Sequence, residues 1–98
     1  MTAVPLPTWE SLRDYVRQTL CARDRLEEHT TPFYAAPIFR RGRLNGYMFH
    51  IEGPRQMKNS AIWAEEDHRL FFYDSIGTRF EEVQLSDAPV LPEVRHAA

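Results

Sequence analysis

The chain of 98 residues has little of several residue types, and each shortage excludes a class of protein. With a single cysteine, Cys21, it can form no internal disulfide, which fits a reducing compartment. No apolar run exceeds four residues, far short of the roughly 20 that cross a membrane. Pro5, Pro7, Glu10 and Arg13 interrupt the start of the chain, so we expect no signal peptide. We therefore expect a cytoplasmic protein without a membrane segment.

The sequence also has few groups that could form a catalytic or metal centre. Metal ligands must cluster, whereas the histidines are scattered along the chain. They are His29, His50, His68 and His96. The four glycines form no Gly-rich phosphate loop, and no nucleophile stands in a known pattern with a base. We therefore expect no metal and no cofactor, and we favour a non-enzymatic protein.

The chain does have a large apolar content, at 43% hydrophobic and 12% aromatic residues. This is enough for one core without disulfides or metal, and we expect a single domain over residues 1–98. The net charge is −2, but residues 32–60 hold five basic residues against one acidic residue. A basic stretch can mark a nucleic-acid face, although an acidic chain overall argues against that partner.

Helical periodicity follows a short N-terminal arm. Prolines keep residues 1–7 extended. Thr8 is typical of a helix N-cap, and apolar residues then recur at spacings of three and four to about Glu28. The pattern predicts an amphipathic helix over residues 8–28. Its apolar stripe consists of Trp9, Leu12, Val16, Leu20 and Leu26.

From Phe33 onward apolar residues alternate, and turn residues recur about every ten positions. Links this short join antiparallel neighbours, so the pattern predicts an α+β fold with a five-stranded antiparallel meander. The strands are expected at 34–40, 44–52, 57–64, 69–74 and 79–85, followed by a loosely held tail at 86–98. The first turn falls at Arg41-Gly42-Arg43 or at Asn45-Gly46. The 74–78 turn predicts a left-handed Gly77.

Pairing Gly53 with Gln56 across the second link assigns the side chains to two faces. The more aliphatic face should form the core beneath the helix. It carries Ile38, Leu44, Tyr47, Phe49, Ile51, Ile62, Ala64, Phe71, Tyr73, Val83 and Leu85. The other face is aromatic, and one helix cannot cover both sides of a sheet. We expect a partner chain, a ligand or curling of the sheet to cover it.

This aromatic face is the expected working surface. Its main residues are His50, Asn59, Trp63, Phe72, Asp74 and Phe80. Three of them form a row across neighbouring strands, His50, Asn59 and Asp74, in which an imidazole and a carboxylate could do acid–base chemistry. Strands lie about 4.8 Å apart, so His50 and Asp74 should be nearly twice that distance from each other. Asp74 is equally suited to capping its own turn.

Two basic groups are further candidates. Arg55, Lys58 and Arg79 should lie at one end of the sheet and could bind a small anion. Alternatively, Arg79 and Arg55 pair with Asp74 and Glu52 in surface salt bridges of little energetic value. Arg40, Arg41 and Arg43 form a basic patch, but their turn should lie beside Glu65-Glu66-Asp67, so we expect mutual neutralisation.

The leading interpretation is a small non-enzymatic interaction domain that self-associates, or binds a protein partner, through the aromatic face. The alternative is a ligand-binding protein or enzyme with a pocket on that face, around the row of His50, Asn59 and Asp74. A third and weaker hypothesis is a single-stranded nucleic-acid binder.

Overall fold

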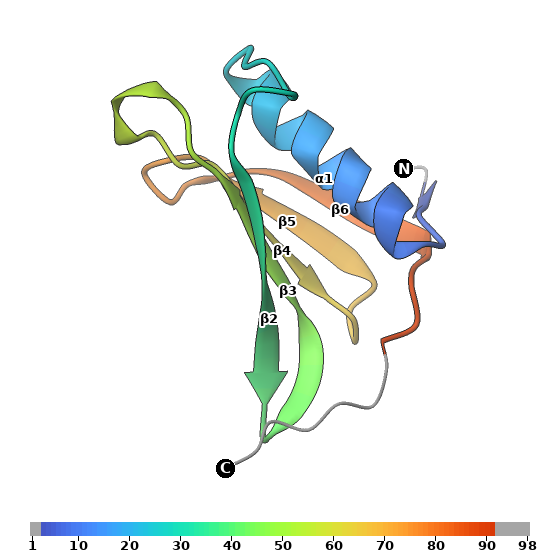
Figure 1. The fold of residues 1–98 in the computed structure, drawn as a ribbon. Helices are drawn as coiled ribbons and strands as arrows, with labels where there is room; N and C mark the ends of the chain where they lie inside the picture. The colour runs from blue at the N-terminus through green and yellow to red at the C-terminus, as the bar shows by residue number, and fades with distance from the viewer. Residues whose placement is uncertain (1–2, 92–98) are drawn as a thin grey trace.

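The computed structural model describes residues 3–91, in which one helix lies across one face of a twisted sheet (Figure 1). The elements are β1 Val4–Pro5, α1 Trp9–Arg23, β2 Phe33–Arg40, β3 Arg43–Ile51, the 3-10 turn η1 Pro54–Gln56, β4 Ser60–Ala64, β5 Arg69–Tyr73 and β6 Arg79–Asp87. The α+β class is confirmed. Most of the predicted tail, residues 92–98, lies outside the described residues.

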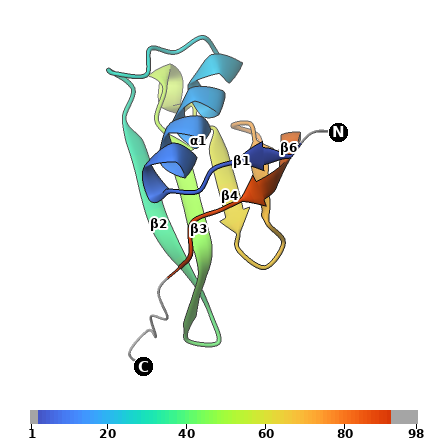
Figure 2. The ribbon, with the colours of Figure 1, turned by 90° about the vertical axis from the view of Figure 1, so that its right-hand side faces the viewer.

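The sheet has six strands, in the order β1-β6-β5-β4-β3-β2, rather than the five predicted. The extra strand comes from the N-terminal arm, where Val4 pairs with Leu85 and β1 runs parallel to β6 (Figure 2). The sheet is therefore mixed and not purely antiparallel. Prolines are tolerated here because β1 is an edge strand, with one side free of ladder hydrogen bonds. Leu6 N–H extends the pairing by donating to the Asp87 carbonyl at 3.0 Å.

Helix α1 begins as predicted and ends earlier than predicted. Thr8 caps it, and the Thr8 and Ser11 side chains each accept a hydrogen bond from the other residue's backbone N–H at 3.0 Å. The helix ends at Arg23 and not at Glu28. The chain then turns back along the helix, and Arg17 holds this return by donating to the Glu28 carbonyl at 2.5 Å.

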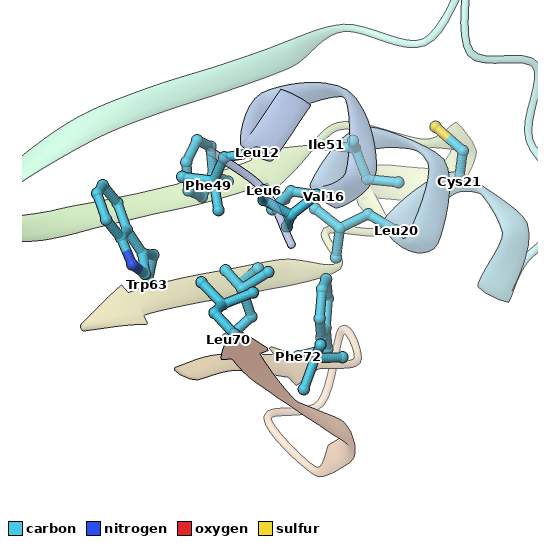
Figure 3. Close-up of a cluster of buried hydrophobic side chains, with 13 residues drawn as sticks. Leu6, Leu12, Val16, Leu20, Cys21, Phe49, Ile51, Trp63, Leu70 and Phe72 are labelled. Atoms are coloured by element: carbon cyan, nitrogen blue, oxygen red, sulfur yellow. The ribbon is translucent and has the colours of Figure 1, made fainter. Parts of the chain in front are cut away.

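The core lies between α1 and the sheet (Figure 3). The predicted stripe supplies three fully buried residues, Leu12, Val16 and Leu20. The sheet contributes Phe49, Ile51, Ala61, Trp63, Leu70, Phe72, Val83 and Leu85. Burying one such side chain contributes roughly 1.5–3 kcal/mol, so this layer supplies most of the driving force for folding.

The register between β3 and β4 differs by one residue from the prediction. Tyr47 lies opposite Trp63, whereas the predicted pairing of Gly53 with Gln56 places Tyr47 opposite Ile62. The cause is the η1 turn, in which Arg55 and Gln56 both adopt left-handed conformations with φ 61°. This turn uses one more residue than the expected link, and a one-residue slip moves every side chain of a strand to the other face.

The predicted faces of β4 and β5 are therefore wrong. Trp63, Leu70 and Phe72 pack beneath the helix, and Ile62, Phe71 and Tyr73 lie on the opposite side. The predicted core positions Tyr47, Phe49, Ile51, Val83 and Leu85 do contribute to the packed core. Val83 and Leu85 keep their side because a bulge shifts the register of β6 opposite Phe72.

The 74–78 turn is confirmed. Gly77 has φ 85°, the left-handed conformation that the turn requires. Asp74 Oδ1 accepts hydrogen bonds from the backbone N–H groups of Ile76 and Thr78, at 3.1 and 2.9 Å. Asp74 thus caps its own turn.

Candidate functional site

The sheet face away from α1 carries a continuous set of apolar and aromatic side chains, which we call the open face. Strand pairing arranges them in two rows, because residues directly opposite each other share a face. One row is Ala36, Met48, Ile62 and Phe71. The other is Tyr34, His50, Ser60 and Tyr73. Tyr34 and Met48 are 47% and 45% exposed, which is high for large apolar side chains.

Paired charges border the open face on the β5–β6 side. The Arg79 guanidinium lies over the Phe71 ring at 4.6 Å and over the Tyr73 ring at 5.6 Å. It also donates to Glu82 Oε1 at 3.2 Å, and Arg69 pairs with the same carboxylate. A cation over the face of an aromatic ring is attracted by the negative charge density of that face. Phe71 and Tyr73 are therefore partly covered by the chain itself.

A second charged group borders the open face at the end of β3. The Tyr34 ring stacks on the His50 imidazole, with centroids 4.9 Å apart. His50 Nε2 lies 3.8 Å from Glu52 Oε2, and Lys58 Nζ lies 3.5 Å from the same oxygen. His50 therefore contacts an aromatic ring and a carboxylate, an arrangement that can bind and orient a polar group.

The predicted row of His50, Asn59 and Asp74 does not form. His50 lies on the open face, whereas Asn59 is buried beneath the helix at 1% exposure. Its side-chain amide donates to the Leu20 carbonyl at 3.3 Å and to Asp24 Oδ2 at 2.5 Å. Asn59 therefore joins the sheet to the end of α1.

The predicted aromatic working surface is also wrong for its largest members. Trp63 and Phe72 have no exposed surface, because α1 covers them. Phe80 packs against Phe72 with ring centroids 6.1 Å apart, and the Arg23 guanidinium lies 4.7 Å from the centroid of the Phe80 ring. Trp63 and Phe72 build the core and cannot meet a partner while the helix is in place, and Phe80 is partly buried against that core.

The predicted anion group is divided among three environments. Lys58 pairs with Glu52, and Arg79 pairs with Glu82 on the open face. Arg55 lines a polar hollow of about 630 Å³ that reaches Ser75, so the 53–56 and 75–78 turns do lie at the same end. The predicted salt bridges Arg79–Asp74 and Arg55–Glu52 are wrong in their partners, because Arg79 pairs with Glu82 and Glu52 pairs with Lys58.

Three findings bear on other classes of site. In residues 3–91 no three His, Cys, Asp or Glu side chains are placed to bind a metal ion. No helix in that range is long and apolar enough to cross a membrane. Burial raises the pKa of the Cys21 thiol, as do the nearby carboxylates of Glu28 and Glu27, against the opposing effects of Arg17 and Thr31. Cys21 is therefore a poor nucleophile.

Comparison with protein-family models, with curated proteins and with solved structures finds no match for this chain.

The sequence predicted the open face only in part. The alternation predicts His50 on the uncovered face, but it predicts Ile62, Phe71 and Tyr73 in the core. Their true side depends on the register set by η1.

Proposed function

We propose that this chain is a small non-enzymatic interaction domain that self-associates through the open face. The observation that carries the proposal is the exposure of Met48, in an apolar row that crosses β2, β3, β4 and β5, and of Tyr34 in the neighbouring row. An apolar centre with a polar rim is the usual anatomy of a protein interface. This proposed surface shares His50 with the expected aromatic face, and it has Ile62, Phe71 and Tyr73 where Trp63 and Phe72 were expected.

The charges of the open face favour a second copy as the partner. Arg69 and Arg79 share Glu82, and Lys58 and His50 share Glu52. Apart from His50, these groups amount to three positive and two negative charges, and so small a net charge repels an identical surface far less than a strongly charged surface would. A two-fold pair of open faces would bury both rows of apolar side chains.

The other hypotheses have less support. A catalytic row of His50, Asn59 and Asp74 would need Asn59 on the open face, and it is buried. Single-stranded nucleic acid would need free ring faces for base stacking, and Arg79 covers those of Phe71 and Tyr73. A free and buried Cys21 suits a reducing compartment, so we propose the cytoplasm as its location.

Sedimentation velocity over a micromolar concentration series tests the proposal. The unaltered chain should shift toward the mass of two chains as its concentration rises. Met48→Glu should weaken the dimer by about tenfold or more, because it replaces apolar burial, worth roughly 1.5–3 kcal/mol, by a charge. Tyr34→Ser should weaken it in the same direction with less disturbance of the sheet.

The matched control is Ile76→Glu, since Ile76 is 85% exposed in the 74–78 turn, outside the open face. This variant should dimerise like the unaltered chain. A chain that stays monomeric at every concentration would refute self-association. Equal weakening by Ile76→Glu and Met48→Glu would refute the assignment to the open face.

A further inference from the structure

The β2–β3 hairpin turn concentrates positive charge at a local cost. Arg40 lies directly opposite Arg43, a cross-strand position in which like charges repel. Arg41 adopts the left-handed conformation at φ 53°, where asparagine or glycine would be far less strained. A two-residue hairpin turn of this kind requires positive φ at both central positions, so the unexpected feature at residue 41 is the arginine and not the backbone angle. Local conflicts of this kind concentrate at functional sites.

A β-bulge beside the turn adds a side-chain amide to the same place. Ile38 lies opposite Gly46 and Phe39 lies opposite Leu44, so Asn45 is the extra residue of the bulge. Bulges redirect a side chain out of the regular alternation. The Asn45 carbonyl accepts a hydrogen bond from Glu65 N–H at 3.2 Å, which fixes the bulge against the β4–β5 turn.

These residues surround a hollow of about 260 Å³. Its lining consists of Arg40, Arg41, Arg43, Asn45 and Glu66. Three of the five carry a positive charge and one carries a negative charge. Glu66 Oε2 lies 3.7 Å from the Arg40 guanidinium, with both side chains more than 60% exposed, and such a pair is weak. The predicted neutralisation by acidic residues is thus seen for Arg40 with Glu66.

We infer that this hollow is a binding site for the phosphate monoester group of a small molecule. Guanidinium groups match phosphate oxygens through two parallel hydrogen bonds, and an amide N–H₂ adds a further donor. A phosphate monoester carries nearly two negative charges and three acceptor oxygens, which suits several convergent donors. The site is at the end of the β2–β3 hairpin and is independent of the open face and its proposed self-association.

An NMR titration of the full chain with inorganic phosphate, at constant ionic strength set by chloride, tests this inference. The backbone amide signals of residues 40–45 and of Glu66 should shift and saturate at millimolar phosphate. Arg41→Asn should weaken binding by about tenfold or more, because it removes a charge-assisted contact. Asparagine tolerates the left-handed conformation, so this variant should keep the turn.

Arg55→Asn is the matched control, since Arg55 also lies in a left-handed turn position, at the opposite end of β3. It should leave phosphate affinity unchanged. Shifts centred on residues 53–58, or weakening by Arg55→Asn in place of Arg41→Asn, would overturn the assignment to the hairpin. Shifts that never saturate would overturn a specific site. Tighter binding of a single-stranded oligonucleotide than of glycerol phosphate would overturn the small-molecule ligand.

Discussion

Asn59 connects the sheet to the end of the helix at the scale of a single residue. Its amide donates to the Leu20 carbonyl, which has lost its helical partner near the end of α1, and to the Asp24 carboxylate. Sequence patterns could not identify this role, because it depends on which face Asn59 occupies. A polar residue near a strand end is equally typical of a solvent position.

Two substitutions at Asn59 measure this role. Asn59→Ala removes the donor to the Leu20 carbonyl and should lower the free energy of unfolding by about 1–3 kcal/mol. Asn59→Asp places a carboxylate beside two acceptors, so this variant should lose more free energy of unfolding at neutral pH than Asn59→Ala does. Urea denaturation compares them, and the gap between the variants should narrow in acid as the new carboxylate is protonated. Equal losses at neutral pH would contradict the observed hydrogen bonds.

At the scale of elements, the helix and the final hairpin could be predicted because local residues determine them. Thr8 caps α1, the spacing of Leu12, Val16 and Leu20 defines its buried side, and Asp74 and Gly77 define the last turn. Each of these signals acts within a few residues. The core side of β3 followed from the same alternation.

The β3–β4 connection could not be predicted, because its conformation goes against residue preference. Arg55 and Gln56 adopt left-handed backbone angles that favour glycine or asparagine, so the shortest link was the natural expectation. Of the two positions predicted for the first turn, Arg41-Gly42-Arg43 is correct and Asn45-Gly46 is not. Asn45-Gly46 offers a turn signal but forms a bulge, and a Cβ on Gly46 would lie 2.0 Å from the Trp63 carbonyl oxygen. Glycine there serves close packing of backbones.

Strand β2 forms one edge of the sheet, and Pro37 lies in the middle of this strand. Ile51 N–H donates to the carbonyl of Asn59, the residue before β4, and Glu52 N–H donates to the Pro32 carbonyl, the residue before β2. Backbone groups alternate along a strand, so Tyr47 directs its groups toward β4. Pro37, opposite Tyr47, therefore directs its backbone toward solvent. Its missing N–H costs no ladder bond and removes a donor from the edge, which opposes strand addition by another chain.

Pro37→Thr restores that donor in a stretch, residues 34–38, that has no charged side chain. We expect the free energy of unfolding to change by less than about 1 kcal/mol, since no existing hydrogen bond is lost. Slow association into large species should increase, and light scattering over time follows it. A variant as soluble as the unaltered chain would show that the edge is protected by something other than Pro37.

At the scale of the whole molecule, the two faces of the sheet have similar compositions and differ mainly in whether the helix covers them. Both are rich in large apolar residues, so composition could not show which one the helix covers. The helix selects the face of Trp63, Leu70 and Phe72. The same choice leaves Ile62, Phe71 and Tyr73 for the open face. The inference from the sequence that still holds is that the sheet carries more apolar side chains than one helix can cover.

The core also makes the molecule sensitive to alkaline pH. Burial, and secondarily the Glu81 carboxylate, raises the pKa of Tyr15 above its ordinary value of 10.0. Burial likewise raises the pKa of Cys21 above 9.0. Both groups are neutral when protonated, so the unfolded chain releases these protons at lower pH than the folded chain does. Their stabilising contribution is complete below pH 9.0 and is lost as pH rises through the folded-state pKa values.

Urea denaturation at pH about 8 and about 11 should therefore show a lower free energy of unfolding at the higher pH. Tyr15→Phe and Cys21→Ala should each reduce that loss, because each removes one proton whose release favours the unfolded chain. Tyr34→Phe is the matched control, since it removes a phenol that is 47% exposed, and it should change the loss least. A loss as large in the Tyr15→Phe, Cys21→Ala double variant as in the unaltered chain would show that other groups cause it. A smaller loss in the double variant would place the alkaline sensitivity in the contact between α1 and the sheet.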